Sequence, residues 1–199
     1  MLNLPTALTL IRLALSPIVL PLLFVYLLPI NNIFINMLLG LVFIAFSLTD
    51  FLDGYLARKY GQETALGSVL DPIADKFLVY SALIALLVVH KIFFVWVIVL
   101  IGREFFMMGL RQVALENQFS IQVSSYGKLK TTLQMICLTF IIINPYQSMG
   151  FGLHGTMIWN DIEFVLLLLA TFLSVYSAAL YYKSFIKQFM AKQTRTTES

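Results

Sequence analysis

Two short stretches of this chain carry carboxylates at spacings that suit metal chemistry. Asp50 and Asp53 stand three residues apart, and Asp71 and Asp75 stand four apart. On helices each pair lies on one face, and two facing helices would bring all four carboxylates to one point. Four like charges repel strongly at low dielectric constant and need cations, and hard oxygen ligands suit Mg²⁺, Mn²⁺ or Ca²⁺. The spacing therefore predicts a divalent metal site.

The helix face that carries the first acidic pair continues with small residues. Gly54 and Ala57 follow at helical spacing, so a bulky polar ligand would find room against the backbone beside the carboxylates. A plainer interpretation is a polar helix pair that only holds a bundle together, although an apolar pair would do this without burying charge.

The composition decides the class of protein. The chain has 199 residues, of which 60% are hydrophobic and 12% charged, and its mean hydropathy is +0.89. A soluble domain cannot hide that much apolar surface, so the sequence predicts an all-α integral membrane protein. Ionisable groups inside such a protein are costly and usually functional. The net charge of +3 is too small to suggest nucleic-acid binding, and the lone Cys137 excludes an internal disulfide.

Six transmembrane helices are expected to position the acidic pairs, within a single domain that spans residues 1–199. They cover approximately residues 8–28, 33–60, 68–89, 92–116, 127–144 and 158–182, with a basic tail from about 183. A short polar loop at 61–67 would join the two acidic helices, so both pairs would lie at one end of the bundle. Pro72 would fall in the first turns of the third helix, where it removes a donor without a large break.

The distribution of basic residues sets the expected orientation. Of the 13 Lys and Arg residues, only Lys91 falls on the side opposite to the acidic residues. Because cytoplasmic loops carry the excess of Lys and Arg, both termini and the acidic cluster are predicted to face the cytoplasm.

The acidic stretch also resembles a known family signature. Residues 50–75 read D-x2-D-G-x2-A-R-x8-G-x3-D-x3-D without a gap or substitution, which is similar to the CDP-alcohol phosphatidyltransferases, integral membrane enzymes of phospholipid synthesis. The resemblance implies two Mg²⁺ ions, with Mn²⁺ as an alternative, held by Asp50, Asp53, Asp71 and Asp75. It also implies that Asp75 removes the proton from an acceptor hydroxyl, which attacks the phosphorus bearing diacylglycerol while CMP leaves.

The same resemblance implies a binding site for CDP-diacylglycerol. Its expected residues are Gly54, Ala57, Arg58, Gly67 and Ser68. The Arg58 guanidinium would bind the CDP phosphates through two parallel hydrogen bonds. Gly67 and Ser68 would let the third helix start close to the nucleotide. The simpler alternatives are an interfacial cation for Arg58 and an ordinary loop and helix cap for Gly67 and Ser68.

A second cationic group indicates the acceptor. Arg103, Arg111, Lys128 and Lys130 lie near the predicted cytoplasmic ends of the fourth and fifth helices, and Arg103 and Arg111 stand eight apart on roughly the same face. A phosphate on the acceptor would explain them. The motifs Gly102–Phe105 and Gly127–Thr131 resemble the phosphatidylglycerophosphate synthase branch, which implies that Arg103, Arg111 and Lys128 bind glycerol 3-phosphate. Ordinary basic flanking of membrane helices is the alternative.

The resemblance further implies a bacterial inner-membrane location, contact with membrane lipids and a homodimer. Two other functions stay open. One is a sibling enzyme with another acceptor, such as inositol phosphate or phosphatidylglycerol. The other is a divalent-cation transporter, since acidic clusters inside membranes also mark ion paths. A transporter needs polar groups along its whole path, whereas the helix halves remote from the acidic end are expected to be almost purely apolar.

Overall fold

The described part of the chain is entirely helical. The structure, a computed structural model, describes residues 17–59, 65–117, 125–145 and 158–197, and the side chains of 50–72, 74, 75, 125–128 and 191–197 lie outside that description. No strand occurs in these residues. The elements are a helix at 17–27, the 3-10 turn η1 (Leu28–Ile30), α2 (Ile33–Lys59), α3 (Ala65–Val88), α4 (Phe94–Glu116), α5 (Ser125–Ile143) and α6 (Ile158–Thr197).

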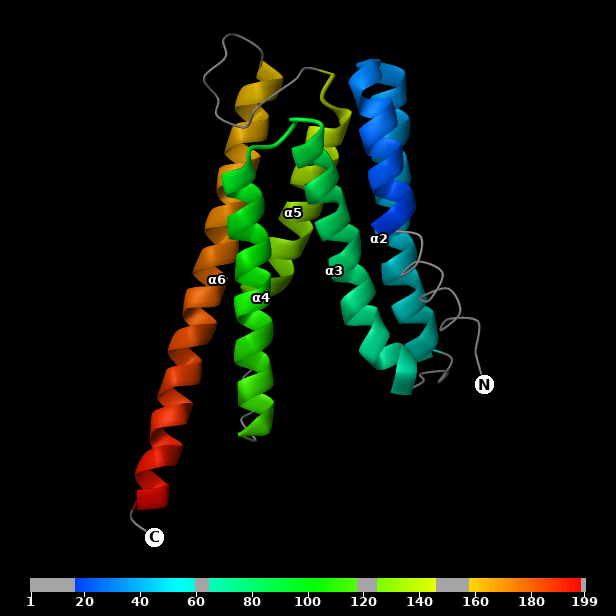
Figure 1. The fold of residues 1–199 in the computed structure, drawn as a ribbon. Helices are drawn as coiled ribbons and strands as arrows, with labels where there is room; N and C mark the ends of the chain where they lie inside the picture. The colour runs from blue at the N-terminus through cyan, green and yellow to red at the C-terminus, as the bar shows by residue number, and fades with distance from the viewer. Residues whose placement is uncertain (1–16, 60–64, 118–124, 146–157, 198–199) are drawn as a thin grey trace.

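The helices form one bundle whose two ends differ (Figure 1). α5 packs against both α2 and α6, and α4 packs against α6. The α2–α3 and α4–α6 pairs lie close together where residues 89–93 connect α3 to α4, and they diverge toward the other end. We call the first end the Lys91 end. The opposite end, where α2 finishes and α3 begins, is called the Asp end.

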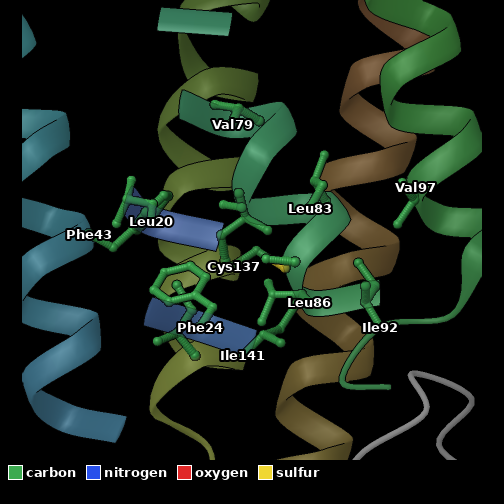
Figure 2. Close-up of a cluster of buried hydrophobic side chains, with 14 of the residues drawn as sticks. Leu20, Phe24, Phe43, Val79, Leu83, Leu86, Ile92, Val97, Cys137 and Ile141 are labelled. Carbon is green, nitrogen blue, oxygen red and sulfur yellow. The ribbon is translucent and has the colours of Figure 1, made fainter. Parts of the chain in front are cut away.

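Apolar side chains at helical spacing build the core. Leu20 and Phe24 are one turn apart on the first helix, and both are fully buried. Figure 2 shows them pointing toward Phe43 of α2, Leu83 of α3 and Ile141 of α5. The Phe24 and Phe43 rings stand 6.5 Å apart in a tilted arrangement. These contacts fix α2, α3 and α5 relative to one another, which in turn positions the acidic residues.

The outer surface is also apolar, as a lipid-facing surface would be. Large exposed hydrophobic side chains occur on every helix, among them Phe34, Ile84, Ile98, Leu129 and Phe172. Within the described residues, one helical segment, Ile158–Met190, is long and apolar enough to cross a membrane, with mean hydropathy 2.1. A membrane bundle fits this surface, and the number of spans and their orientation remain predictions.

Two helix boundaries differ from the expected ones. α3 begins at Ala65, so Gly67 and Ser68 lie inside the helix, and Pro72 is its eighth residue, beyond the first turns. A proline there leaves the Ser68 carbonyl without its helical donor, which a membrane bundle tolerates. The expected basic tail is also wrong as a boundary, because α6 continues to Thr197. Its Lys, Gln, Met and Ala residues have good helix propensity, so high polarity does not end the helix.

The Lys91 end contains buried polar side chains, which corrects the expectation of almost purely apolar helix halves. Asn36, Asn144 and Glu163 are at most 1% exposed, and Lys91 is 4% exposed. The Lys91 ammonium donates to the backbone carbonyl of Asn144, which also accepts from Asn36 Nδ2 at 3.2 Å. Asn144 Nδ2 donates to Glu163 Oε2 at 2.8 Å and to Asn160 Oδ1 at 3.2 Å. We call these five residues the Lys91 cluster.

The Lys91 cluster joins four parts of the chain through one asparagine. Asn144 follows α5 directly and contacts α2, the α3–α4 connection and α6. Burial lowers the pKa of Lys91 from its ordinary value of 10.5 to about 8, against the opposing negative charge of Glu163. A lysine in a predicted loop is expected to be solvated, and only the packing shows that Lys91 is buried.

Candidate active site

The backbone brings both acidic pairs to the Asp end. Asp50 and Asp53 lie in the second half of α2, and Asp71 and Asp75 lie in the first half of α3. Figure 1 shows these two helices side by side with those portions at the same end. The carboxylates themselves lie outside the described side chains, so their convergence on a metal stays a prediction.

Distances along the helices indicate which cations share the level of the carboxylates. Asp50, Asp71 and Arg111 each stand 17 residues from the Lys91 end of their helices, which corresponds to about 25 Å at 1.5 Å per residue. Arg103 stands only nine residues from that end, or about 14 Å. Arg111 therefore lies at the level of the acidic pairs, and Arg103 lies deeper toward the Lys91 end.

The contacts between α2 and α5 give the register of the fifth helix. Gly40 meets Ile143, whose Cγ1 atom would be 2.6 Å from an added Cβ, and Ser47 Oγ contacts Met135 Sδ at 3.7 Å. The helices are antiparallel, so the first turns of α5, which contain Lys128, lie toward the same end of the bundle as the acidic stretch of α2.

Three charged side chains meet where α4, α5 and α6 pack together. Arg103 Nη1 donates to Glu104 Oε1 at 2.7 Å, and the Lys130 ammonium bonds to the same oxygen. Arg103 Nε donates to the Ser174 carbonyl at 2.9 Å, and Arg103 Nη2 donates to Ser177 Oγ at 2.6 Å. The side chains of Arg103, Glu104 and Lys130 are 10%, 15% and 7% exposed. We call these three residues the Glu104 cluster.

Arg103 and Arg111 do not share one environment, although their spacing suggested a common face. Eight residues of α-helix separate them by about 12 Å and by a rotation of about 80°. The Arg103 guanidinium is directed to α6, whereas Arg111 is exposed and makes no hydrogen bond or ion pair with any residue that the structure describes. A ligand that both arginines contact would therefore have to lie between their two levels.

The expected donor-binding residues follow the backbone of the two acidic helices. Gly54, Ala57 and Arg58 lie in the last two turns of α2, and Gly67 and Ser68 lie in the first turn of α3. These five residues thus belong to adjoining helix ends. Their side chains, like that of Lys128 in α5, lie outside the described set, so their contacts stay predictions.

Comparison with known proteins decides the family. Residues 2–180 match the family described as CDP-alcohol phosphatidyltransferase. The chain belongs to this family. It is similar to proteins named CDP-diacylglycerol--glycerol-3-phosphate 3-phosphatidyltransferase in Rickettsia typhi, with 37% identity over 92% of this chain and 96% of the relative. The protein of that name in Bacillus subtilis is 36% identical over 82% of this chain and 90% of the relative.

The donor set of this family member fits a divalent cation. The two acidic pairs offer four carboxylates from neighbouring helix ends, and carboxylate oxygen is the ligand that hard divalent ions prefer. CDP-alcohol phosphatidyltransferases generally depend on a divalent metal, which agrees with that chemistry.

The sequence-based site omitted two residues that the packing brings forward. From the sequence, Lys130 belongs to the cationic group with Arg103, Arg111 and Lys128 but not to the residues expected to bind glycerol 3-phosphate. Glu104 has no expected role beyond its place in the motif at 102–105. The available signal was the spacing: Lys128 and Lys130 are two apart on a helix, which separates their faces. A carboxylate next to Arg103 in an apolar helix also needed a partner.

Polar atoms without a partner lie next to the Glu104 cluster. The Gln134 Nε2, Thr171 Oγ1 and Ser174 Oγ atoms are buried and have no hydrogen-bond partner among the described residues. Gln134 is one turn from Lys130 on α5, and Thr171 is one turn from Ser174 on α6. Buried polar groups in native proteins are normally paired with protein, water or ligand. These three atoms are therefore candidates for contacts with water or a ligand.

Proposed function

We propose that this chain transfers the phosphatidyl group of CDP-diacylglycerol to sn-glycerol 3-phosphate, which gives phosphatidylglycerophosphate and CMP. The observation that carries the proposal is family membership over residues 2–180, joined to relatives of that name that align along nearly their whole length. The acidic pairs and the Arg111-bearing part of α4 lie toward the same end of the bundle, which supports it.

The donor substrate is assigned to the adjoining ends of α2 and α3. Asp50, Asp53, Asp71 and Asp75 would hold two Mg²⁺ ions, or Mn²⁺ in their place, and these ions would neutralise charge on the diphosphate when bound. Gly54 and Ala57 leave the backbone accessible to the nucleotide, as do Gly67 and Ser68. Arg58 binds phosphate oxygens as a fixed, always charged donor.

The acceptor is activated by one carboxylate of the same site. Asp75 is assigned as the general base that takes the proton from the acceptor hydroxyl, so that this oxygen attacks the phosphorus directly and CMP departs. Asp75 is the acidic residue nearest to the Lys91 end of α3, and it is thus the one closest in level to the Glu104 cluster. That position suits a group that faces the acceptor rather than the nucleotide.

The phosphate of the acceptor is assigned to Arg111, Lys128 and Arg103. Arg111 is exposed at the level of the acidic pairs, so its guanidinium is available to an incoming anion. Lys128 lies in the first turn of α5, toward the same end of the bundle as the acidic stretch of α2. Arg103 already donates to Ser174, Ser177 and Glu104. Arg103 contributes its remaining N–H groups and its charge from the side of the phosphate that faces the Lys91 end.

We place the enzyme in a bacterial inner membrane as a bundle of six spans, a homodimer with both termini and the active site on the cytoplasmic side. The exposed apolar side chains around the bundle and the Ile158–Met190 span support the membrane part. The water-soluble CMP product favours a cytoplasmic site.

The packing between the two polar clusters argues against the transporter alternative. A layer of almost fully buried apolar residues separates them on α5 and α6: Cys137, Leu138, Ile141, Leu167 and Ala170. An ion path would need polar groups or water across that layer. The polar residues of the Lys91 end are instead bonded to one another.

The test is release of CMP from CDP-diacylglycerol by the purified full-length protein with glycerol 3-phosphate, inositol 1-phosphate or serine as acceptor. Turnover is expected with glycerol 3-phosphate and Mg²⁺. Turnover with another acceptor alone would transfer the assignment to a sibling enzyme.

Arg111→Ala should raise the KM for glycerol 3-phosphate ten- to a hundred-fold, since a charge-assisted contact contributes about 1.5–3 kcal/mol. The KM for CDP-diacylglycerol should hardly change, and Arg111→Lys should recover only part of the loss.

A further inference from the structure

We propose that the Lys91 end of the bundle binds a phospholipid of the surrounding bilayer in a cavity of its own. The cavity has a volume of about 330 Å³ and is partly open to the outside, and small-ligand sites typically have about 300–1,000 Å³. Its walls come from the end of the first helix with η1 and from residues 88–91, which lead from α3 to α4. The acidic pairs lie at the opposite end of the bundle, so this site is distinct from the proposed active site.

The cavity wall is divided between apolar and polar side chains. Val25, Leu28, Pro29, Val88 and Val89 form its apolar part. Asn31 and His90 also line the cavity, and both are exposed. Neither side chain makes a hydrogen bond or ion pair with any residue that the structure describes. An amide and an imidazole each offer an N–H donor, so the wall presents two donors beside an apolar surface.

Lys91 also lines the cavity but is not counted as a charge for the ligand. Its ammonium donates to the Asn144 carbonyl inside the Lys91 cluster, and Glu163 is its counter-charge. Among the lining residues there is no carboxylate that would repel an anion. The contacts offered to a phosphate are therefore those of Asn31 and His90.

The backbone at these two positions supports a role for their side chains. Among the described residues, Asn31 and His90 are the non-glycine residues with positive φ, 58° in each case. Lys91 N–H donates to the Leu86 carbonyl at 2.9 Å and His90 N–H to the Leu87 carbonyl at 3.1 Å, which is a Schellman cap with His90 at the position that glycine usually occupies. A side chain strains the backbone there more than glycine would. Strained residues persist where function uses them.

The cavity lies at the level of the bundle where lipid headgroups are expected. The two tryptophans of the chain, Trp96 and Trp159, lie in the first turns of α4 and α6, and both helices begin at the Lys91 end (Figure 1). Tyr26, next to the lining residue Val25, is exposed. Tryptophan and tyrosine are enriched where a membrane meets water. A phosphate that binds His90 and Asn31 at this level would have its acyl chains beside the apolar wall, whereas a free phosphate would leave that wall uncovered.

The experiment measures lipid binding to the full-length protein in detergent by native mass spectrometry. Dioleoyl phosphatidylglycerol is the probe, dioleoylglycerol lacks its phosphate, and glycerol 3-phosphate lacks its acyl chains. The affinity for the probe should fall about ten-fold in His90→Gly and in Asn31→Gly, since a hydrogen bond to a charged group typically contributes that much. His90→Asn keeps a donor at a left-handed residue and should retain most of the affinity. Asn117→Gly is the matched control, because Asn117 caps the far end of α4.

Thermal unfolding separates binding from a purely structural role of His90. Without lipid, the midpoint of His90→Gly should equal or exceed that of the unsubstituted protein, because glycine relieves the backbone strain. The rise in midpoint on adding the probe should be smaller in this variant. A lower midpoint without lipid, joined to an unchanged rise with lipid, would overturn the proposal in favour of a structural role.

Three binding results would also overturn the proposal. They are unchanged affinity for the probe in both glycine variants, equal binding of dioleoylglycerol, and equal occupancy by glycerol 3-phosphate alone. The KM values for both substrates should be the same in His90→Gly as in the unsubstituted enzyme. Absence of CMP release with glycerol 3-phosphate would overturn the proposed function and leave this site unaffected.

Discussion

The bundle contains two buried groups of charged residues that use the same chemistry to different ends. The Lys91 cluster and the Glu104 cluster each combine a lysine with a glutamate, and each joins at least three parts of the chain. In the Lys91 cluster, Asn144 stands between the two charges and satisfies both with its backbone carbonyl and its side-chain amide. In the Glu104 cluster, two cations share one carboxylate. Each cluster has a buried polar atom in it or beside it without a partner among the described residues, Asn36 Oδ1 in the first and Ser174 Oγ beside the second.

The difference shows that buried charge alone does not identify a site. The Lys91 cluster has one cation, Lys91, and one anion, Glu163. Lys91, Asn144 and Glu163 are each at most 4% exposed. The Glu104 cluster is more exposed and lies nearer to the acidic helix ends. Position relative to the acidic pairs, rather than burial, therefore separates the two clusters. The following experiments test this division.

The largest effect is expected at the Asp end. Asp75→Asn should lower kcat by about 10²–10⁴-fold at saturating substrate and metal, because a missing general base typically costs that much. Asp50→Asn, Asp53→Asn and Asp71→Asn should instead weaken metal and nucleotide binding first. Initial rates at several Mg²⁺ concentrations separate the two outcomes. A normal kcat in the Asp75→Asn enzyme would remove its assignment as the base.

Removal of the metal should stop turnover altogether. With excess chelator the acidic pairs cannot hold a diphosphate, since like charges then face each other. Added Mg²⁺ or Mn²⁺ should restore the rate, while Ca²⁺ should bind without supporting full turnover because its geometry is looser. Undiminished turnover in chelator would contradict the metal site and leave the acidic pairs with a structural role.

At the Lys91 end a substitution should cost stability and spare kinetics. Glu163→Leu removes the acceptor of Asn144 Nδ2, whose bond to it measures 2.8 Å. A buried group left unsatisfied typically costs about 1–3 kcal/mol, so the thermal unfolding midpoint should fall. Both KM values, measured well below that midpoint, should stay the same. Asp161→Leu is the matched control, because Asp161 is exposed and two residues away.

A change in KM for either substrate in the Glu163→Leu enzyme would break the comparison. It would mean that the two ends communicate through the apolar layer. An unchanged unfolding midpoint would show that the Lys91 cluster contributes no net stability.

The pH dependence of stability offers a finer test of the same end. The pKa of Lys91 is lowered from 10.5 to about 8 in the folded protein. Between these values the unfolded chain binds more protons at this residue than the folded one, so stability rises with pH in that window. The destabilisation caused by the buried ammonium is full below pH 8 and is relieved as the pH approaches 10.5. The unfolding midpoint of the unsubstituted protein relative to Lys91→Met should therefore rise from pH 7.5 to pH 9.5. A constant difference would mean that Lys91 stays charged throughout.

The sequence predicts most of the helices because their signal is local. The apolar runs and the turns at 28–32 and 89–93 are strong, so α2 was expected at 33–60 and is observed at Ile33–Lys59. The end of α6 was missed because polarity indicates exposure to water and does not indicate loss of helix. The start of α3 was missed because Gly67 and Ser68 are typical of loops, although they also fit the first turn of a helix.

The clusters could not be predicted, because they depend on which helices meet. In the sequence, Lys91 is a cation in a predicted loop and Glu163 is a charge near a helix start. The two residues are 72 positions apart. Only the packing of α5 between α2 and α6 makes Asn144 their common partner. The acidic pairs differ in that both lie close in sequence, on consecutive helices. Their meeting at one end follows from a short connection, which is why the motif was informative before the fold.

The smallest expected effect concerns one close contact between α2 and α5 near the Lys91 end. A Cβ at Gly40 would lie 2.6 Å from Ile143 Cγ1 and 3.0 Å from its Cδ1, whereas at Gly109 it would meet nothing within 4 Å. Both glycines are in helices, where alanine is favoured over glycine by about 0.5–1 kcal/mol. Gly109→Ala should therefore raise the unfolding midpoint slightly. Gly40→Ala should lose that gain and more, because Ile143 must shift away and loosen the side of α5 that carries Asn144. The kinetics of the Gly40→Ala enzyme should stay normal. Equal stabilisation by both substitutions would mean that Ile143 moves freely, and that the tight packing of the Lys91 end relies on its polar cluster alone.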